Sequence, residues 1–332
     1  MTDSDFTAEK ISAYASFAMI SEAAAYPKPG NVHRLKDFKE THFEHFLASA
    51  ASVQPVFQKI AKESANAESK NPDQKNGSAA SFGAYFEEAV ENSRQIQAGG
   101  NTHFGTLLLL LPIAAAAGKL NKKTDRDTLL KTAHEICRNT TEEDAVCFYN
   151  AFCSLSIPVI KAGKNNELEY DLTDAALPGK IKENNVSLFD LMERGAKRDM
   201  ISAEWATGFE KSKLFAEKFQ KNKKRFEKKP KTCFRTPFNS AAVYTFMEFL
   251  AEYPDTFIST KFDEKAAIKV QKKAARIMKN KKTGKKNKNL RKMIPEIEKL
   301  DEDLRKKKMN PGSIADITAA GIFIALSEGT EI

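Results

Sequence analysis

The chain has 332 residues, 41% of them hydrophobic, which is enough to bury the core of one large domain or two ordinary ones. Its formal charge of +9 is unevenly spread, because residues 211–310 hold 30 Lys+Arg against 12 Asp+Glu while the rest is net acidic. The four cysteines form no C-x-x-C pair and give no zinc signature with the five histidines, which excludes a disulfide framework and a structural zinc site.

No segment of the sequence is suited to a membrane. The longest apolar run, residues 107–117, is shorter than the ~20 residues that a membrane-spanning helix needs. The first ten residues are polar and acidic, unlike a secretory signal. We therefore expect a cytoplasmic protein with no membrane contact.

Apolar residues recur at helical spacing almost throughout the chain, and alternating strand patterns are absent. This predicts an all-α fold, a single helical-bundle-like domain over residues 1–332. About eleven helices are expected, near residues 6–25, 40–63, 79–97, 102–118, 125–138, 141–161, 187–228, 237–252, 264–279, 288–308 and 312–327. Pro112 should kink the fourth of them, and residues 163–183 are expected to be an irregular connection.

Two lysine-rich stretches, near residues 219–233 and 280–290, are predicted to be basic, partly flexible insertions. Such charge is compatible with a polyanion partner such as nucleic acid. Proteins that bind single-stranded nucleic acid place aromatic residues among the basic ones. The lysine runs 221–225 and 281–286 contain no aromatic residue. We therefore interpret both stretches as solvated surface.

Three polar clusters separate Ala-rich helical patterns. They are Tyr26–Arg34, Gly99–Thr106 and Asn310–Asp316, and each combines glycine with amide, hydroxyl or charged side chains. Glycine lets backbone N–H groups approach a ligand closely, and a helix that starts at Asn101 or Thr102 directs its positive end at any anion held there. The clusters therefore predict three walls of one phosphate site.

Several side chains of these clusters can bind anions or move protons. Lys28 lies between two prolines on a stiff segment, and Arg34 follows closely. His103 begins a predicted helix, where neutral imidazole is favoured, so it is the first candidate for acid–base chemistry. His33 is the second candidate, although it could equally cap a turn or lie on the surface.

Carboxylates on apolar helix faces are a separate signal, because a buried carboxylate is costly without a partner. Glu22 continues the stripe of Ile11 and Ala18, and Asp316 is followed at helical spacing by small and aromatic residues. A magnesium ion or a cationic side chain would offset either charge. Asp144 is a third candidate ligand, but in the first turn of its helix it could simply complement the helix dipole.

At these clusters the chain resembles the triphosphoribosyl-dephospho-CoA synthase family. The resemblance rests on Glu22 with Pro27-Lys28-Pro29-Gly30, Gly100-Asn101-Thr102-His103 with Gly105, Asp255-Thr256, and Asn310-Pro311-Gly312 with Ala315-Asp316, in the family's order. The resemblance implies an all-helical fold and a reaction of ATP with dephospho-CoA that releases adenine and leaves a triphosphoribosyl group on a ribose hydroxyl.

With this reaction in mind, each candidate residue receives a role. His103, His33 and Glu22 are the candidate catalytic residues, and Glu22, Asp144 and Asp316 are the candidate Mg²⁺ ligands. Lys28, Gly30, Arg34, Gly100, Asn101, Thr102, Gly105, Asn310 and Gly312 are assigned to the triphosphate and ribose of ATP, and Arg198 and Lys261 to a second anionic substrate.

The sequence also departs from the family's usual pattern. His33 stands where an aspartate is usual, and Phe104 stands where a lysine often follows the histidine. Tyr170-Asp171 and the stretch from Arg198 to Trp205 resemble a divergent branch found in methanogens and in bacteria with tetrahydromethanopterin-linked C1 metabolism. The alternative acceptor is therefore a pterin or furan precursor of a C1 carrier. A homodimer is one assembly compatible with these features.

Overall fold

The computed structural model describes residues 6–69, 81–155, 170–279 and 288–332, and every regular element among them is a helix. The α-helices are α1 (Ala8–Ala24), α2 (Phe43–Ser52), α3 (Gln54–Ser69), α4 (Phe82–Gln95), α5 (Phe104–Leu120), α6 (Arg126–Arg138), α7 (Glu142–Ser154), α8 (Leu177–Glu183), α9 (Leu188–Gly195), α10 (Met200–Thr207), α11 (Glu210–Lys228), α12 (Pro237–Glu252), α13 (Thr256–Lys261), α14 (Glu264–Met278), α15 (Leu290–Lys306) and α16 (Gly312–Ser327). One 3₁₀ turn, η1 (Pro230–Thr232), follows α11. The all-α prediction is confirmed.

The helices are more numerous than the predicted eleven, because two long predicted helices are divided and because the short helices α8 and α13 lie where no helix was predicted. The segment 40–63 contains α2 and α3, which separate at Val53, just before Pro55 removes a backbone donor from the helical pattern. The segment 187–228 contains α9, α10 and α11. Asp199 caps a new helix start there, and Gly208 ends α10 in the left-handed conformation.

Two further expectations need correction. The basic stretch at 219–233 is no flexible insertion, because most of it is the second half of α11, where Phe219 and Phe226 are fully buried. The expected irregular connection contains the short helix α8. Of the other basic stretch, residues 280–287 lie outside the described residues, and α15 begins at Leu290. Helix α5 runs on through Pro112.

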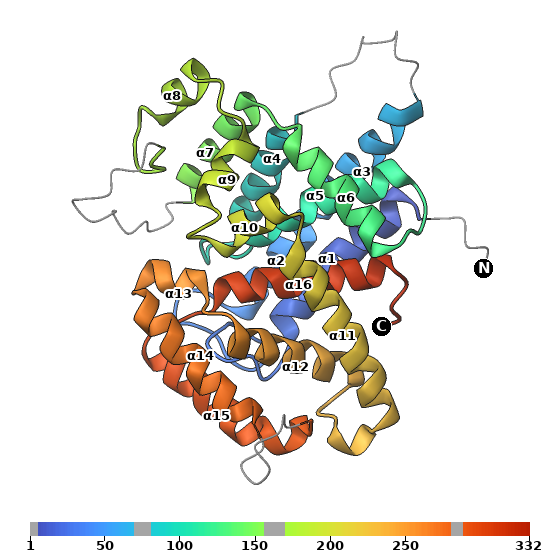
Figure 1. The fold of residues 1–332 in the computed structure, drawn as a ribbon, viewed down its shortest axis with the longest axis vertical. Coiled ribbons are helices and arrows are strands. Elements are labelled where there is room, and N and C mark those ends of the chain that lie inside the picture. The colour runs from blue at the N-terminus through green and yellow to red at the C-terminus, as the bar shows by residue number, and fades with distance from the viewer. Residues whose placement is uncertain (1–5, 70–80, 156–169, 280–287) are drawn as a thin grey trace.

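Helix α16 is the central element of the fold. In Figure 1 it crosses the middle of the molecule, with α3–α10 on one side and α11–α15 on the other. It contacts α1, α5, α10, α11, α12 and α13. Almost every residue of α16 is buried, which accounts for a sequence that is apolar all round rather than amphipathic.

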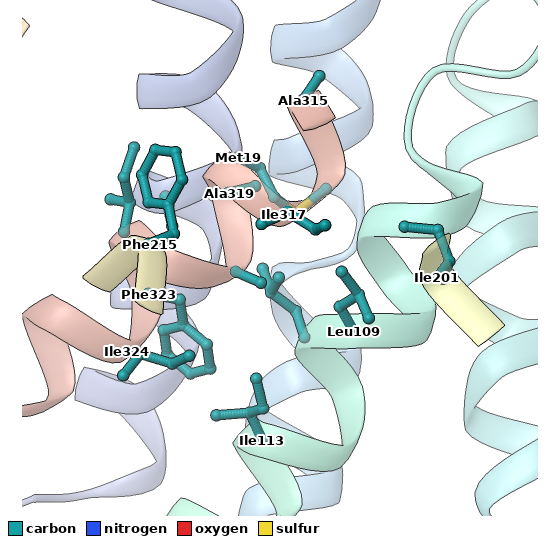
Figure 2. Close-up of a cluster of buried hydrophobic side chains, with 14 of the residues drawn as sticks. Met19, Leu109, Ile113, Ile201, Phe215, Ala315, Ile317, Ala319, Phe323 and Ile324 are labelled. Carbon is teal, nitrogen blue, oxygen red and sulfur yellow. The ribbon is translucent and has the colours of Figure 1, made fainter. Parts of the chain in front are cut away.

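One cluster of buried apolar side chains joins the helices around α16. Figure 2 shows Met19 of α1, Leu109 of α5 and Phe215 of α11 gathered against Ile317 and Ile324 of α16. The extent of the domain, residues 1–332, stays a prediction. None of the helices in the described part of the chain is both long and apolar enough to cross a membrane.

Glycines allow the closest helix contacts in this core. A Cβ added at Gly118 of α5 would lie 2.1 Å from the backbone oxygen of Ala61 in α3. A Cβ added at Gly321 of α16 would lie 2.4 Å from the ring of Phe215 in α11. Both distances are far inside van der Waals contact, so these helix pairs pack at their present spacing only with glycine there.

Gly118→Ala should therefore destabilise the protein. The new methyl group meets backbone atoms of α3, which cannot rotate away, and overpacking of this kind costs about 1–3 kcal/mol. Gly179→Ala in α8 is the matched control, because nothing lies within 4 Å of an added Cβ there. The control should leave the free energy of unfolding unchanged or raise it by up to about 1 kcal/mol, since alanine favours a helix over glycine. Urea unfolding followed by circular dichroism measures both, and equal stabilities of the two variants would contradict the expected α3–α5 contact.

Candidate active site

A buried ion pair lies where α1 ends. The side chain of Lys28 is 1% exposed and its Nζ donates both to the Glu22 carboxylate and, at 2.8 Å, to the Glu22 backbone oxygen. Burial raises the pKa of Glu22 and lowers that of Lys28, and each charge opposes the shift of the other. The pair therefore holds the loop after α1 against the end of that helix.

Helix α15 holds the same loop from the other side. Asp301, 2% exposed, accepts from the backbone N–H of Gly30 at 2.8 Å and lies 3.4 Å from Nε2 of His33. Arg305 donates to both oxygens of Asp301 at 2.8 and 2.9 Å, and its Nη2 donates to the backbone oxygen of Asn31. Burial alone would raise the pKa of Asp301, but the contacts with His33 and Arg305 keep it below its ordinary value.

Gly30 is required where the loop meets the start of α16. Its φ is +77°, and an added Cβ would lie 2.6 Å from the backbone oxygen of Met309 and 2.9 Å from Cδ of Pro311. The loop can thus approach the Asn-Pro-Gly turn this closely only with glycine at position 30. Two of the three predicted clusters are in direct contact here.

The third cluster reaches the same place through the first turn of α5. Thr106 donates to Oδ1 of Asp316 at 2.5 Å, and a Cβ added at Gly105 would lie 2.2 Å from Oδ2 of the same carboxylate. The N-cap residue of this helix is His103, and the backbone N–H of Phe104 donates to Oδ1 of Asn101 at 3.1 Å. Asp316 thereby lies against the positive end of α5.

Two further helices begin beside Asp316, and their caps are shared between elements. Asp255 accepts from the backbone N–H of Ile258 in α13 and from that of Ile314 in α16, at 3.0 and 2.9 Å. The hydroxyl of Thr256 accepts from the backbone N–H of Met200, the first residue of α10, and lies 2.9 Å from Oγ of Ser313. The starts of α5, α10, α13 and α16 therefore converge.

The carboxylates at these helix starts influence one another. Burial, together with the charges of Glu22, Asp255 and Asp199, raises the pKa of Asp316 to about 8. Burial and the Asp199 charge raise the pKa of Asp255 to about 7, against three backbone N–H groups that favour the charged form. The site thus holds more negative charge than its surroundings stabilise, so a cation would be favoured there.

His103 lies beside this cluster and is 2% exposed. Burial, with a smaller effect of the Lys28 charge, lowers its pKa to about 3, so the ring is neutral at pH 7. Its Nδ1 lies 2.9 Å from Oγ of Ser49, and its buried Nε2 has no hydrogen-bond partner in the described structure. An imidazole nitrogen in this state is available to a ligand.

Lys28, His103 and Asp316, although 75 or more residues apart in the sequence, therefore lie within electrostatic range of one another. The Lys28 charge acts on His103, and the Asp316 charge acts on Lys28. His33 belongs to the contact with Asp301 instead, where it also accepts from the backbone N–H of Leu35 at 3.3 Å.

Asp144 lies elsewhere. Its Oδ2 accepts from the backbone N–H of Thr141 at 2.7 Å in a capping box, and its Oδ1 accepts from that of Gly83 at 2.6 Å. The carboxylate thus joins α4 to α7. The structure does not bring it together with Glu22 and Asp316.

The remaining predicted residues lie at the edges of these elements. Arg34, Gly100, Asn101, Arg198 and Lys261 are exposed, whereas Thr102, Asn310 and Gly312 are partly exposed. Nε of Arg34 donates to the backbone oxygen of Ala24, at the end of α1. Oδ1 of Asn310 is buried and has no hydrogen-bond partner in the ranges that the structure describes.

Sequence reasoning missed Asp301, Arg305 and Ser49. A signal for Asp301 is present, because it follows Leu300 on the apolar face of α15 and precedes Leu304 by three residues. Arg305 follows one turn later, at the spacing of an ion pair. Ser49 gives no comparable signal, since a serine within a helix has no distinctive pattern.

The residues present do not form a metal cage. In residues 6–69, 81–155, 170–279 and 288–332, no group of three or more His, Cys, Asp or Glu side chains could hold a metal ion. Glu22 is paired with Lys28, and Asp144 lies between α4 and α7. Asp316 is the one predicted ligand whose surroundings favour a cation.

The neutral His103 should make stability depend on pH. Its pKa is about 3 in the folded protein and near 6.5 when unfolded, so the unfolded chain binds the extra proton, and stability is lost as pH falls from 6.5 towards 3. The loss should be about 1.4 kcal/mol per pH unit for this one group. Urea unfolding of the wild type and His103→Gln between pH 7 and 4 should show the steeper slope in the wild type. His42→Gln, at an exposed histidine, is the control, and equal slopes for the wild type and His103→Gln would show that His103 is not buried in neutral form.

Comparisons with known proteins point to the family that the sequence resembles. The family model described as ATP:dephospho-CoA triphosphoribosyl transferase (CitG) matches residues 8–331. A search of curated proteins gives no match. Among solved structures, a "putative triphosphoribosyl-dephospho-coA synthase" from Archaeoglobus fulgidus is similar, with 23% sequence identity and a TM-score of 0.60 over 85% of this chain and 99% of that one.

The structural similarity supports the fold alone at this level of identity, whereas the family match covers almost every element described above, including all three polar clusters. The chain therefore belongs to the ATP:dephospho-CoA triphosphoribosyl transferase family, and it is a transferase.

Proposed function

We propose that the protein transfers the triphosphoribosyl group of ATP to a hydroxyl of dephospho-CoA and releases adenine by substitution at C1′. The observation that carries this proposal is the convergence of Lys28, His103 and Asp316 at the starts of α5, α10, α13 and α16. The site combines groups for an anion, a cation and a proton, and each has a use in this reaction.

The triphosphate is assigned to the helix starts. First-turn N–H groups and the helix dipole both favour a bound phosphate. Gly30, Gly105 and Gly312 are packed against Met309, Asp316 and Phe257, so they allow the helix starts to approach one another closely, and Lys28 supplies a positive charge nearby. Thr102, Asn101, Gly100 and Asn310 lie at the same ends of α5 and α16 and are proposed to orient ribose and phosphate oxygens.

Magnesium is proposed to accompany ATP, and Asp316 is the residue that would hold it. Mg²⁺ is usually bound by one or two carboxylates together with substrate phosphates, which suits a site without a complete protein cage. A triphosphate beside Asp316, Asp255 and Glu22 would otherwise add to a charge that already raises the pKa of Asp316 to about 8. When bound, the ion would neutralise that charge.

His103 is the proposed proton carrier. As the acceptor hydroxyl attacks C1′, its O–H bond breaks, a new C1′–O bond forms, and the C1′–N bond to adenine breaks with its electron pair going to the base. The acceptor hydroxyl loses one proton and adenine gains one. An imidazole that takes the proton from the hydroxyl and passes it to adenine therefore balances the reaction. Burial is the main cause of the low pKa of His103, and a triphosphate near Lys28 would offset the smaller contribution of the Lys28 charge.

The acceptor is assigned to the exposed edge of the site. Arg198, just before α10, and Lys261, the last residue of α13, are exposed cations that we propose for the second anionic substrate, whereas the exposed Arg34 of the loop is proposed for the triphosphate. His33, held by Asp301, is proposed to position the loop rather than to carry a proton.

Adenine release tests the reaction. Purified protein incubated with ATP, Mg²⁺ and dephospho-CoA should release free adenine and form a product heavier than dephospho-CoA by the triphosphoribosyl group. Chromatography and mass analysis measure both. Appearance of ADP or AMP without adenine would contradict substitution at C1′. Adenine release only with a pterin or furan acceptor would instead show that dephospho-CoA is the wrong acceptor.

Asp316→Asn should lower the rate of adenine release by about 100-fold or more, because the amide keeps the shape of the carboxylate but loses the charge that would hold the cation. Asp127→Asn is the matched control, since Asp127 pairs with Lys213 on the surface and is 73% exposed. Excess Mg²⁺ should partly restore the variant if its defect is cation binding. Equal rates for Asp316→Asn and the control would remove Asp316 from the site.

A further inference from the structure

We propose that Ser49 is a positioning residue that holds His103 in its Nδ1–H form, so that Nε2 accepts the proton of the attacking hydroxyl. This inference rests on the proposed function for its catalytic half. Its structural half, the choice of tautomer, can be tested separately from the reaction.

A chain of hydroxyl groups runs away from the buried ring. Oγ of Ser49 in α2 lies 2.9 Å from Nδ1 of His103 and 2.6 Å from Oγ of Ser93 in α4. Oγ of Ser93 lies 3.4 Å from Oγ1 of Thr102, which is partly exposed. Ser49 is fully buried and Ser93 nearly so. Helices α2 and α4 thus contribute side chains to the site without belonging to any of the three polar clusters.

Helix α2 also fixes the plane of the imidazole. The ring of Phe46, one turn before Ser49 on α2, meets His103 edge-on, with centroids 5.1 Å apart and planes at 83°. With Nδ1 hydrogen-bonded and the ring held by Phe46, the position of Nε2 is determined. Nε2 is buried and unpartnered among the residues that the structure describes, so it is the nitrogen left for a substrate.

Burial and the surrounding charges keep the ring neutral, which leaves a lone pair on one of its two nitrogens. Lys28, from the loop after α1, is the charged group that acts on the ring, and it is paired with Glu22 of α1. Asp316 of α16 is hydrogen-bonded to Thr106 of α5. His103 itself stands at the positive end of α5. Because Nδ1 is occupied by Ser49, the unpartnered Nε2 is the nitrogen left to carry the lone pair in the proposed form.

The hydrogen bonds then have one direction. In the proposed form, Nδ1–H donates to Ser49, Ser49 donates to Ser93, and Ser93 donates to Thr102, which is partly exposed. When Nε2 takes the proton of the acceptor hydroxyl, the imidazolium shares its positive charge with Nδ1–H. The hydroxyl of Ser49 already accepts a hydrogen bond from this N–H. Ser49 therefore stabilises the protonated ring without touching the substrate.

Two measurements on the full chain test this inference. The first is ¹⁵N NMR of histidine-labelled protein at pH 7, with His103→Gln to assign the signal, which reports which ring nitrogen carries the proton. The second is adenine release, with kcat and the KM for ATP determined separately. The variants are Ser49→Ala, Ser49→Thr, which keeps a hydroxyl, and Ser93→Ala, which breaks the next link.

The control is Ser52→Ala. Ser52 lies on α2 three residues after Ser49, and its hydroxyl donates to the Ser49 backbone oxygen at 2.9 Å. The same substitution is thus made on the same helix without removing a contact to His103. Melting temperatures identify any variant that loses its fold. If Ser49→Ala does not fold, Ser93→Ala still tests the inference.

The wild type should show the Nδ1–H form of His103, and Ser49→Ala the Nε2–H form that is usual in free histidine. Ser49→Ala should lower kcat by about 10-fold or more with little change in the KM for ATP, Ser93→Ala should have a smaller effect, and Ser49→Thr should recover most of the loss. An active wild type with Nε2–H, or a Ser49→Ala variant as fast as Ser52→Ala, would overturn the role of Ser49. A folded wild type that releases no adenine with any acceptor would overturn the proposed function instead, while the NMR signal would still decide the tautomer.

Discussion

The buried contact between Glu22 and Lys28 is the constraint on which the site depends. Neither charge can be withdrawn from water alone without a large cost, so the two side chains must arrive together. Glu22 is fixed by α1, and Lys28 is carried between two prolines on a stiff segment. The pair therefore determines where the chain goes after α1. Asp301 and Arg305 then hold the following residues, and Gly30 lets the loop touch the turn before α16.

The helix starts are joined by the groups that cap them. In an isolated helix, a cap satisfies N–H groups of its own first turn. Here Asp255 caps α13 and also accepts from α16, while Thr256 of α13 accepts from the first N–H of α10. The same hydrogen bonds that end the loops thus set the distances between helices. The consequence is an accumulation of buried carboxylates, and burial together with their mutual repulsion raises the pKa values of Asp255 and Asp316.

The sequence indicated site residues where a charged side chain lies on a helix face that is otherwise apolar. Glu22 and Asp316 stand out on apolar helix faces, and both prove to lie at the site's contacts. Asp301 carries the same signal on α15 but belongs to no glycine-rich cluster, and it was missed. Asp144 shows the limit of the signal, because a capping box explains its position and the structure gives it that role. Helix boundaries at Val53 and Gly208 depended on local backbone chemistry that periodicity does not contain.

The site combines opposite electrostatic effects on its two titratable groups. The positive charge of Lys28 disfavours a proton on His103, whereas the neighbouring carboxylates favour a proton on Asp316. Both effects become weaker when a polyphosphate and its counter-cation are present, because the anion offsets Lys28 and the cation offsets the carboxylates. Burial adds to both effects, so in the free protein His103 is a poor base and Asp316 is partly protonated near neutral pH. Under the proposed function, a bound polyphosphate and its cation would therefore change the charge states of both groups.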